Sequence, residues 1–98
     1  MASNVRLSGS QTSARSESDV RINQKNQKII IGASNNLSFN PQAQFYSNDG
    51  GQTWSQSNLP AVTGDQNQSD PCVGWTPDGT AWALTVGVGS SNVVRSFT

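Results

Sequence analysis

Apolar residues along this chain fall in short runs, without the 3.6-residue period of an amphipathic helix. Turn-forming residues separate the runs, a spacing that favours short strands. The stretch 76–80, Thr-Pro-Asp-Gly-Thr, predicts a hairpin turn, because Pro presets φ at the first corner and Gly accepts a positive φ. The pattern predicts an all-β fold, with strands at 5–7, 20–22, 29–32, 44–46, 53–55, 72–75, 81–86 and 93–96, the first being the weakest.

The chain repeats itself once, with an offset of roughly 50 residues. Ser-Glu-Ser-Asp at 16–19 and Gln-Ser-Asp-Pro at 68–71 each precede a strand, a turn and an apolar strand. Such a period is typical of the four-stranded antiparallel blade of a β-propeller. We therefore expect an N-terminal segment at 1–15, a first blade at 16–60 and a second blade at 61–98 that lacks its fourth strand.

The octapeptide Ser-Asn-Asp-Gly-Gly-Gln-Thr-Trp at 47–54 places a tryptophan directly after a tight turn. Ser47 and Asp49 have short side chains that can bond the amides of their own turn. Gly51 can adopt a positive φ, and Trp54 can then fold under the turn and pack into the sheet. We interpret the octapeptide as a structural device that fixes the register of two strands.

This octapeptide resembles the Asp-box, or bacterial neuraminidase repeat, at each of its defining positions: Ser47, Asp49, Gly51, Thr53 and Trp54. The sequence from about 16 to 98 also resembles sialidase-like proteins, notably at 20–23, 45–46, 69–71 and 78–80. The resemblance implies two blades of a sialidase-like propeller, with the box on the rim and away from any active centre. We expect an extracellular or secreted location, although no signal peptide is visible.

The catalytic residues that the resemblance implies are largely missing. Sialidases of this class use three arginines, a tyrosine–glutamate pair and an aspartic acid. Arg21 loosely resembles the first arginine, but Asn23 stands where the family has proline. Glu17 is the only glutamate, and the only tyrosine, Tyr46, precedes the box. We expect no catalysis by this chain alone; the alternative is that it belongs to a sialidase-type glycoside hydrolase whose active site lies in other blades.

Composition removes several function classes. The six basic and six acidic residues balance, whereas a binder of nucleic acid carries a basic excess. With no histidine and one cysteine, we expect neither a metal nor a cofactor. We expect Cys72 to be a small buried hydrophobic residue. No apolar run is long enough to span a membrane.

Two further expectations concern partners. Aromatic faces with amide side chains bind sugars, so Trp75, Trp82, Asn35 and Asn36 are candidate carbohydrate-binding residues, the asparagines on loops; the alternative is that both tryptophans belong to the core. The chain is also expected to bind itself, because two blades cannot close a ring. The strand at 5–7 would complete the second blade of another copy, and six blades favour a trimer.

Overall fold

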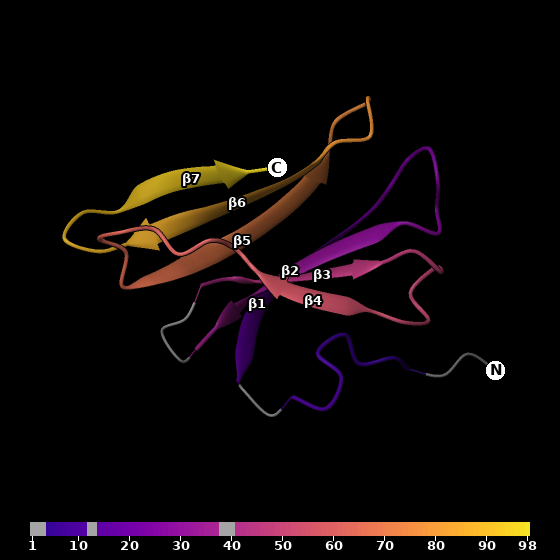
Figure 1. The fold of residues 1–98 in the computed structure, drawn as a ribbon, viewed down its shortest axis with the longest axis horizontal. Coiled ribbons are helices and arrows are strands. Elements are labelled where there is room, and N and C mark those ends of the chain that lie inside the picture. The colour runs from indigo at the N-terminus through magenta and orange to yellow at the C-terminus, as the bar shows by residue number, and fades with distance from the viewer. Residues whose placement is uncertain (1–3, 12–13, 38–40) are drawn as a thin grey trace.

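The computed structural model describes residues 4–11, 14–37 and 41–98, which form two antiparallel sheets and, within these ranges, no helix. Strand order is β1-β2-β3-β4 in the first sheet and β5-β6-β7 in the second (Figure 1). The strands are β1 (Arg15–Ile22), β2 (Ile30–Asn36), β3 (Ala43–Ser47), β4 (Ser55–Asn58), β5 (Asn67–Trp75), β6 (Ala81–Val88) and β7 (Val93–Phe97). The predicted all-β fold is confirmed.

Seven of the eight predicted strands overlap an observed one, and most are longer than predicted. The strand predicted at 53–55 begins at Ser55, because Thr53 and Trp54 belong to the turn that precedes it. The prediction of a strand at 5–7 is wrong: these residues lead into a turn closed by the Gly9 amide on the Arg6 carbonyl. Parts of the predicted segment 1–15 and of the predicted blade 16–60, namely 1–3, 12–13 and 38–40, lie outside the described residues.

The turns between paired strands form as their residues dictate. In the β5–β6 hairpin, the Thr76 amide bonds the Thr80 carbonyl, and Gly79 has φ 89°. In the β1–β2 hairpin, the Asn23 side-chain oxygen accepts from the amides of Lys25 and Asn26. Both hairpins lie at the same end of the molecule, where a small hollow is lined by residues of each.

The two sheets repeat one another in their irregularities as well as their order. The β1–β2 ladder slips between Ser16 and Asp19, and the β5–β6 ladder slips between Ser69 and Cys72. Each bulge contains an acidic residue with positive φ, Glu17 at 50° and Asp70 at 54°. A bulge adds a residue and bends its strand, so two bulges at matching places indicate a true structural repeat.

Aligning the two bulges equates positions across the sheets. Asp19 pairs with Ala33 and Cys72 with Leu84, so Cys72 corresponds to Asp19 and Leu84 to Ala33. Two paired positions further along, Trp82 corresponds to Ile31. The third strands match too, since Phe45 pairs with Gly32 and Phe97 with Ala83, the counterpart of Gly32.

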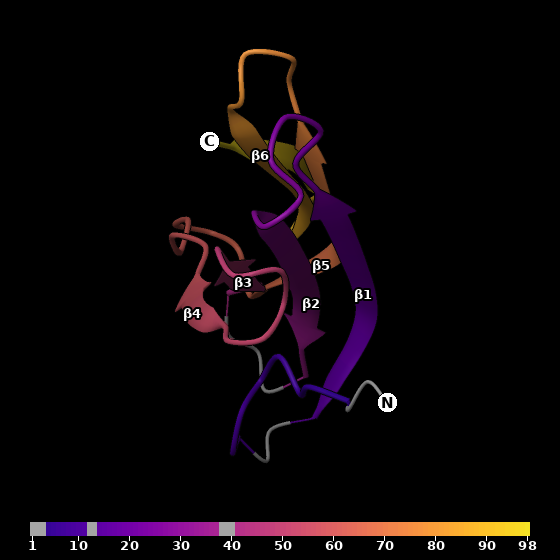
Figure 2. The ribbon, with the colours of Figure 1, turned by 90° about the vertical axis from the view of Figure 1, so that its right-hand side faces the viewer.

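The sheets pack face to face through β1, β2 and β5 and diverge toward β4 and β7 (Figures 1 and 2). Side chains alternate between the faces of a strand. The first sheet contributes Ile31 and Ala33 to the core, and the second contributes Val73 and Ala83. Leu59, just after β4, completes this cluster. We call the contact between the two sheets the seam.

The other face of each sheet is covered differently. On the first sheet, Leu7 lies over Gly32, its Cδ2 atom 3.4 Å from where a Cβ would stand. On the second sheet, Cys72 is exposed, so the expectation of a buried cysteine is wrong. The physical reason is that Cys72 faces away from the seam. None of the described residues belongs to a helix that could cross a membrane.

Candidate functional site

The turn between β3 and β4 is held by two side chains that collect its amides. The Ser47 hydroxyl accepts from the Gly51 amide at 2.9 Å and donates to Asp49 at 2.8 Å. Asp49 Oδ1 accepts from the amides of Gln52 at 3.0 Å and Thr53 at 2.9 Å, and Oδ2 accepts from the Thr53 hydroxyl. The structure thus brings the predicted box residues into one network, which we call the box turn.

The hydrogen bonds of the box turn favour the ionised form of Asp49. The Thr53 hydroxyl has the largest effect, followed by the Thr53 amide and the Ser47 hydroxyl, and together they lower the pKa of Asp49 from 3.8 to about 2. The carboxylate is therefore charged at neutral pH and occupied by its own turn. With this geometry, Asp49 holds the turn together through its hydrogen bonds, and its oxygens are not free to act as a catalytic acid or base.

Trp54 closes the box turn by bonding it. Its indole Nε1 donates to the Gly51 carbonyl at 2.9 Å, and its ring lies against Gly51, whose φ is 92°. The ring is half-buried, less than the deep packing expected from the sequence. The Gly50 amide also donates to the Lys28 carbonyl at 2.9 Å, so the box turn is tied to the β1–β2 hairpin.

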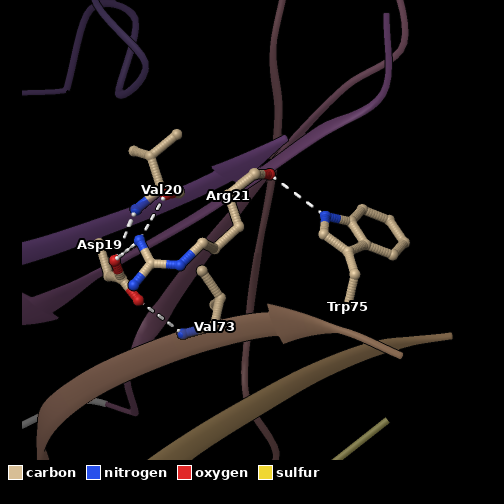
Figure 3. A network of polar contacts seen from close by, with 5 residues as sticks. All are labelled: Asp19, Val20, Arg21, Val73 and Trp75. Carbon is tan, nitrogen blue, oxygen red and sulfur yellow. Dashed lines mark hydrogen bonds and ion pairs between the residues drawn. The ribbon is translucent and has the colours of Figure 1, made fainter. Parts of the chain in front are cut away.

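A second polar network joins the two sheets across the seam (Figure 3). Asp19 Oδ2 accepts from the Val73 amide at 2.9 Å, while Oδ1 accepts from the Val20 amide and pairs with Arg21 at 2.6 Å. Trp75 Nε1 donates to the Arg21 carbonyl at 3.2 Å. These contacts link β1 to β5, which are 54 positions apart in the chain.

Gln68 also links the two sheets, at the other end of the seam. Its side-chain oxygen accepts from the Gln42 amide at 2.7 Å, and its nitrogen donates to the Pro60 carbonyl at 3.0 Å. The residue is 3% exposed. A buried amide with both ends bonded fixes the loops that enter β3 and leave β4 against β5.

The seam opens outward into a cleft of about 640 Å³ between β3–β4 and β6–β7. Among the residues that the structure describes, no Asp, Glu, Lys or Arg lines this cleft. Rings, hydroxyls and amides are mixed with aliphatic groups in its walls; among them are Tyr46, Phe97, Gln44, Ser55, Ser57 and Asn58. Such a lining suits an uncharged ligand that offers both apolar faces and hydroxyl groups.

The candidate sugar-binding residues are not brought together. Trp75 lies in the seam and its N–H donates to the Arg21 carbonyl. Trp82 is among the residues that line the cleft, but it alternates onto the opposite face of the second sheet. Asn35 and Asn36 close strand β2 instead of lying on a loop, and Asn35 is buried with its amide donating to Glu17. They lie at the end of the sheet away from the tryptophans, because β2 runs away from the hairpin end.

Sequence reasoning missed an ion pair that fixes the linker between the sheets. Arg95 donates to Asp65 through two nitrogens, at 2.7 and 2.8 Å, and these bonds and charges lower the pKa of Asp65 and raise that of Arg95. Gly87 makes room for the pair: a Cβ there would stand 2.3 Å from Asp65 Oδ2. The only sequence signal was Gly87 itself, inside an apolar strand.

Two further findings concern metal ligands within the chain and similarity to known proteins. Within 4–11, 14–37 and 41–98, no three acidic or cysteine side chains gather as metal ligands would. Comparisons with models of protein families, with curated proteins and with solved structures found no match.

Proposed function

We propose that this chain is a self-assembling structural segment of a β-propeller of the sialidase-like Asp-box type, with its two sheets as successive blades. The observation that carries the proposal is the repeated register. Both sheets share the bulge and the order of their first three strands, and Phe45 and Phe97 pair with equivalent positions of the neighbouring strand. Sheets that repeat, and that stack with one face on the opposite face of the next, can continue in the same sense.

The box turn supports the same proposal. Ser47, Asp49 and Thr53 are joined by hydrogen bonds within the turn, and the Trp54 indole donates to the Gly51 carbonyl. These groups are used by the turn itself, which favours a structural role. We extend the proposal to an extracellular or secreted protein without catalysis of its own.

The second sheet gives the reason for assembly. In the first sheet, β4 pairs with β3, while β7, the counterpart of β3, has no strand on its outer edge within the described part of the chain. An open edge presents unpaired amides and carbonyls and is a template for another chain. The chain therefore offers surfaces that a partner of its own kind can cover.

Light scattering at micromolar concentration tests this proposal. Three copies would supply six blades, so we expect about three times the chain mass. A folded monomer at all accessible concentrations would contradict the proposal. The alternative is that the chain is a piece of a sialidase-type glycosidase, and turnover of a fluorogenic sialoside tests it. We expect no turnover. Turnover by the parent chain that Arg21→Ala abolishes would favour the alternative.

A second candidate function follows from the cleft. We propose that a neutral glycan can bind between β3–β4 and β6–β7, because the lining combines Tyr46, which is 43% exposed, with hydroxyl and amide side chains. Stacking on an aromatic face and hydrogen bonds to hydroxyls would supply the affinity. Calorimetric titration with neutral and acidic glycans tests this: Tyr46→Ala should abolish binding, and Leu37→Ala, outside the lining, should not.

A further inference from the structure

The second sheet carries an uncovered apolar surface on the side away from the seam. It consists of one residue from β5, three from β6 and one from β7, which alternate onto the same face; we call it the outward face. Its largest side chains are exposed, Trp82 at 37%, Leu84 at 38% and Val94 at 71%. The outward face comprises Cys72, Trp82, Leu84, Val86 and Val94.

The internal repeat shows what normally covers such a face. Trp82 corresponds to Ile31 and Leu84 to Ala33, by the register of the two bulged ladders. In the first sheet these positions are 9% and 2% exposed, because the second sheet packs on them. The outward face is therefore the counterpart of a face that is already one half of a sheet-on-sheet contact.

The other half of that contact also has an exposed counterpart. Val73 packs into the seam, and its counterpart on the first sheet is Val20, which is 45% exposed. Ile22, the counterpart of Trp75, is 54% exposed on the same face. One chain thus displays both complementary halves of its own internal contact, on opposite sides.

We propose that the outward face of one copy docks on the Val20–Ile22 face of a second copy, repeating the seam between chains. The inference rests on the proposed function and names the surfaces that carry out the assembly. Such a contact joins two different patches, so it propagates head to tail and closes into a ring only if the rotation permits. Aligned packing of two sheets is the geometry that the seam itself uses.

The first sheet partly covers this face with its own chain. Leu7 lies over Gly32, and a Cβ at Gly32 would also stand 3.6 Å from Val20 Cγ2, so Leu7 lies beside Val20. Docking of a second copy must displace Leu7 or pack around it. The inference is that Leu7 competes with the partner for this face, whereas the sequence predicted that residues 5–7 would help the copies to join.

A disulfide cross-link tests the contact at one position. In the seam the Asp19 side chain reaches the Val73 amide, so Cys72, the counterpart of Asp19, should come close to Val20 of the next copy. Val20→Cys should therefore give covalent dimers and larger species under mild oxidation, linked between positions 72 and 20 in peptide maps. The control Ser57→Cys, exposed on β4, should give several-fold less.

Two results separate this inference from the proposed function. Oligomers in light scattering without a 72–20 link above the control would overturn the docking faces and leave self-assembly standing. A monomer without cross-linking would overturn both. Leu7→Ala provides a second measurement: it should raise the yield of the 72–20 link several-fold, and a lower yield would contradict the competition between Leu7 and the partner.

Discussion

The two sheets have the same strand order and bulge but opposite surroundings. Ile31 and Ala33 are 9% and 2% exposed, while their counterparts Trp82 and Leu84 are 37% and 38% exposed. The difference does not come from the sequence of the strands, since the second sheet carries the larger apolar residues. It comes from the neighbour: within the described chain, the first sheet has one on this face and the second has none. Burial in a repeat is decided by what stacks next.

The same comparison explains the two positions where the ladders slip. Asp19 faces the seam and bonds the Val73 amide, a polar use of a covered position. Cys72 stands at the matching place on the outward face and is exposed. A small, weakly polar side chain there leaves the face apolar, which suits contact with a second sheet.

The largest loss of stability should come from truncating Ile31, the buried counterpart of Trp82. Ile31→Ala removes a buried branched side chain from the core and should cost about 2–4 kcal/mol of unfolding free energy at every protein concentration. Trp82→Ala should lower stability only at concentrations where the chain assembles. Thermal unfolding over a range of concentrations checks this; equal losses from both variants in dilute solution would break the comparison.

The next largest loss of stability should come from a substitution at Gly87 in the second sheet. Gly87→Ala puts a methyl group within 2.3 Å of Asp65 and 2.7 Å of Arg95, so it should break their ion pair and loosen the linker between the sheets. Gly74→Ala in neighbouring β5 meets no atom within 4 Å and serves as the control. Chemical denaturation should show a clear loss for the first variant alone, and indistinguishable midpoints would refute this account of Gly87.

The box turn exists only in the first sheet of the described chain, so damage to it should leave the second sheet's pairing intact. Trp54→Ala removes a half-buried ring and one hydrogen bond and should cost about 2 kcal/mol. Amide hydrogen exchange should accelerate in β3 and β4 more than in β6 and β7. Trp54→Phe, which keeps most of the ring but loses the bond to Gly51, should fall between the variant and the parent.

The smallest effect is a dependence on pH. The pKa of Asp49 is about 2 in the folded chain and 3.8 without its turn, so the unfolded chain binds the proton more readily. Its contribution is present in full above about pH 4 and is lost as the pH falls through about 2. Asp49→Asn should flatten the acid limb of the stability profile, and an unchanged slope would contradict the proposed bonds.

Local patterns predicted what local chemistry decides. The hairpin at 76–80 and the strands of both copies followed from turn residues and short apolar runs, because these depend on neighbours in the chain. The box turn was found through Gly51 and Asp49 for the same reason. By contrast, the placement of Asn35 was wrong, because the β1–β2 ladder resumes beyond the bulge and pairs Asn35 with Ser16, past the apolar run of β2.

Contacts between distant residues were out of reach. Nothing near Asp19 in the sequence indicates that it bonds an amide 54 positions away, and Asp65 gave no sign of its partner Arg95. The exposure of Cys72 could not be predicted either, since an apolar run reads as buried whether or not a neighbouring sheet is present. Sequence patterns locate strands, and stacking decides which of their faces are covered.

The most direct test of the central claim compares the mass of the parent chain with that of Trp82→Lys by light scattering. A lysine on the outward face should prevent docking through the cost of burying its charge, and we expect the folded chain to accept it because Trp82 is 37% exposed. We predict about three times the chain mass for the parent, and a monomer with unchanged circular dichroism for the variant. A monomeric parent, or a variant that assembles as well as the parent, would contradict the account.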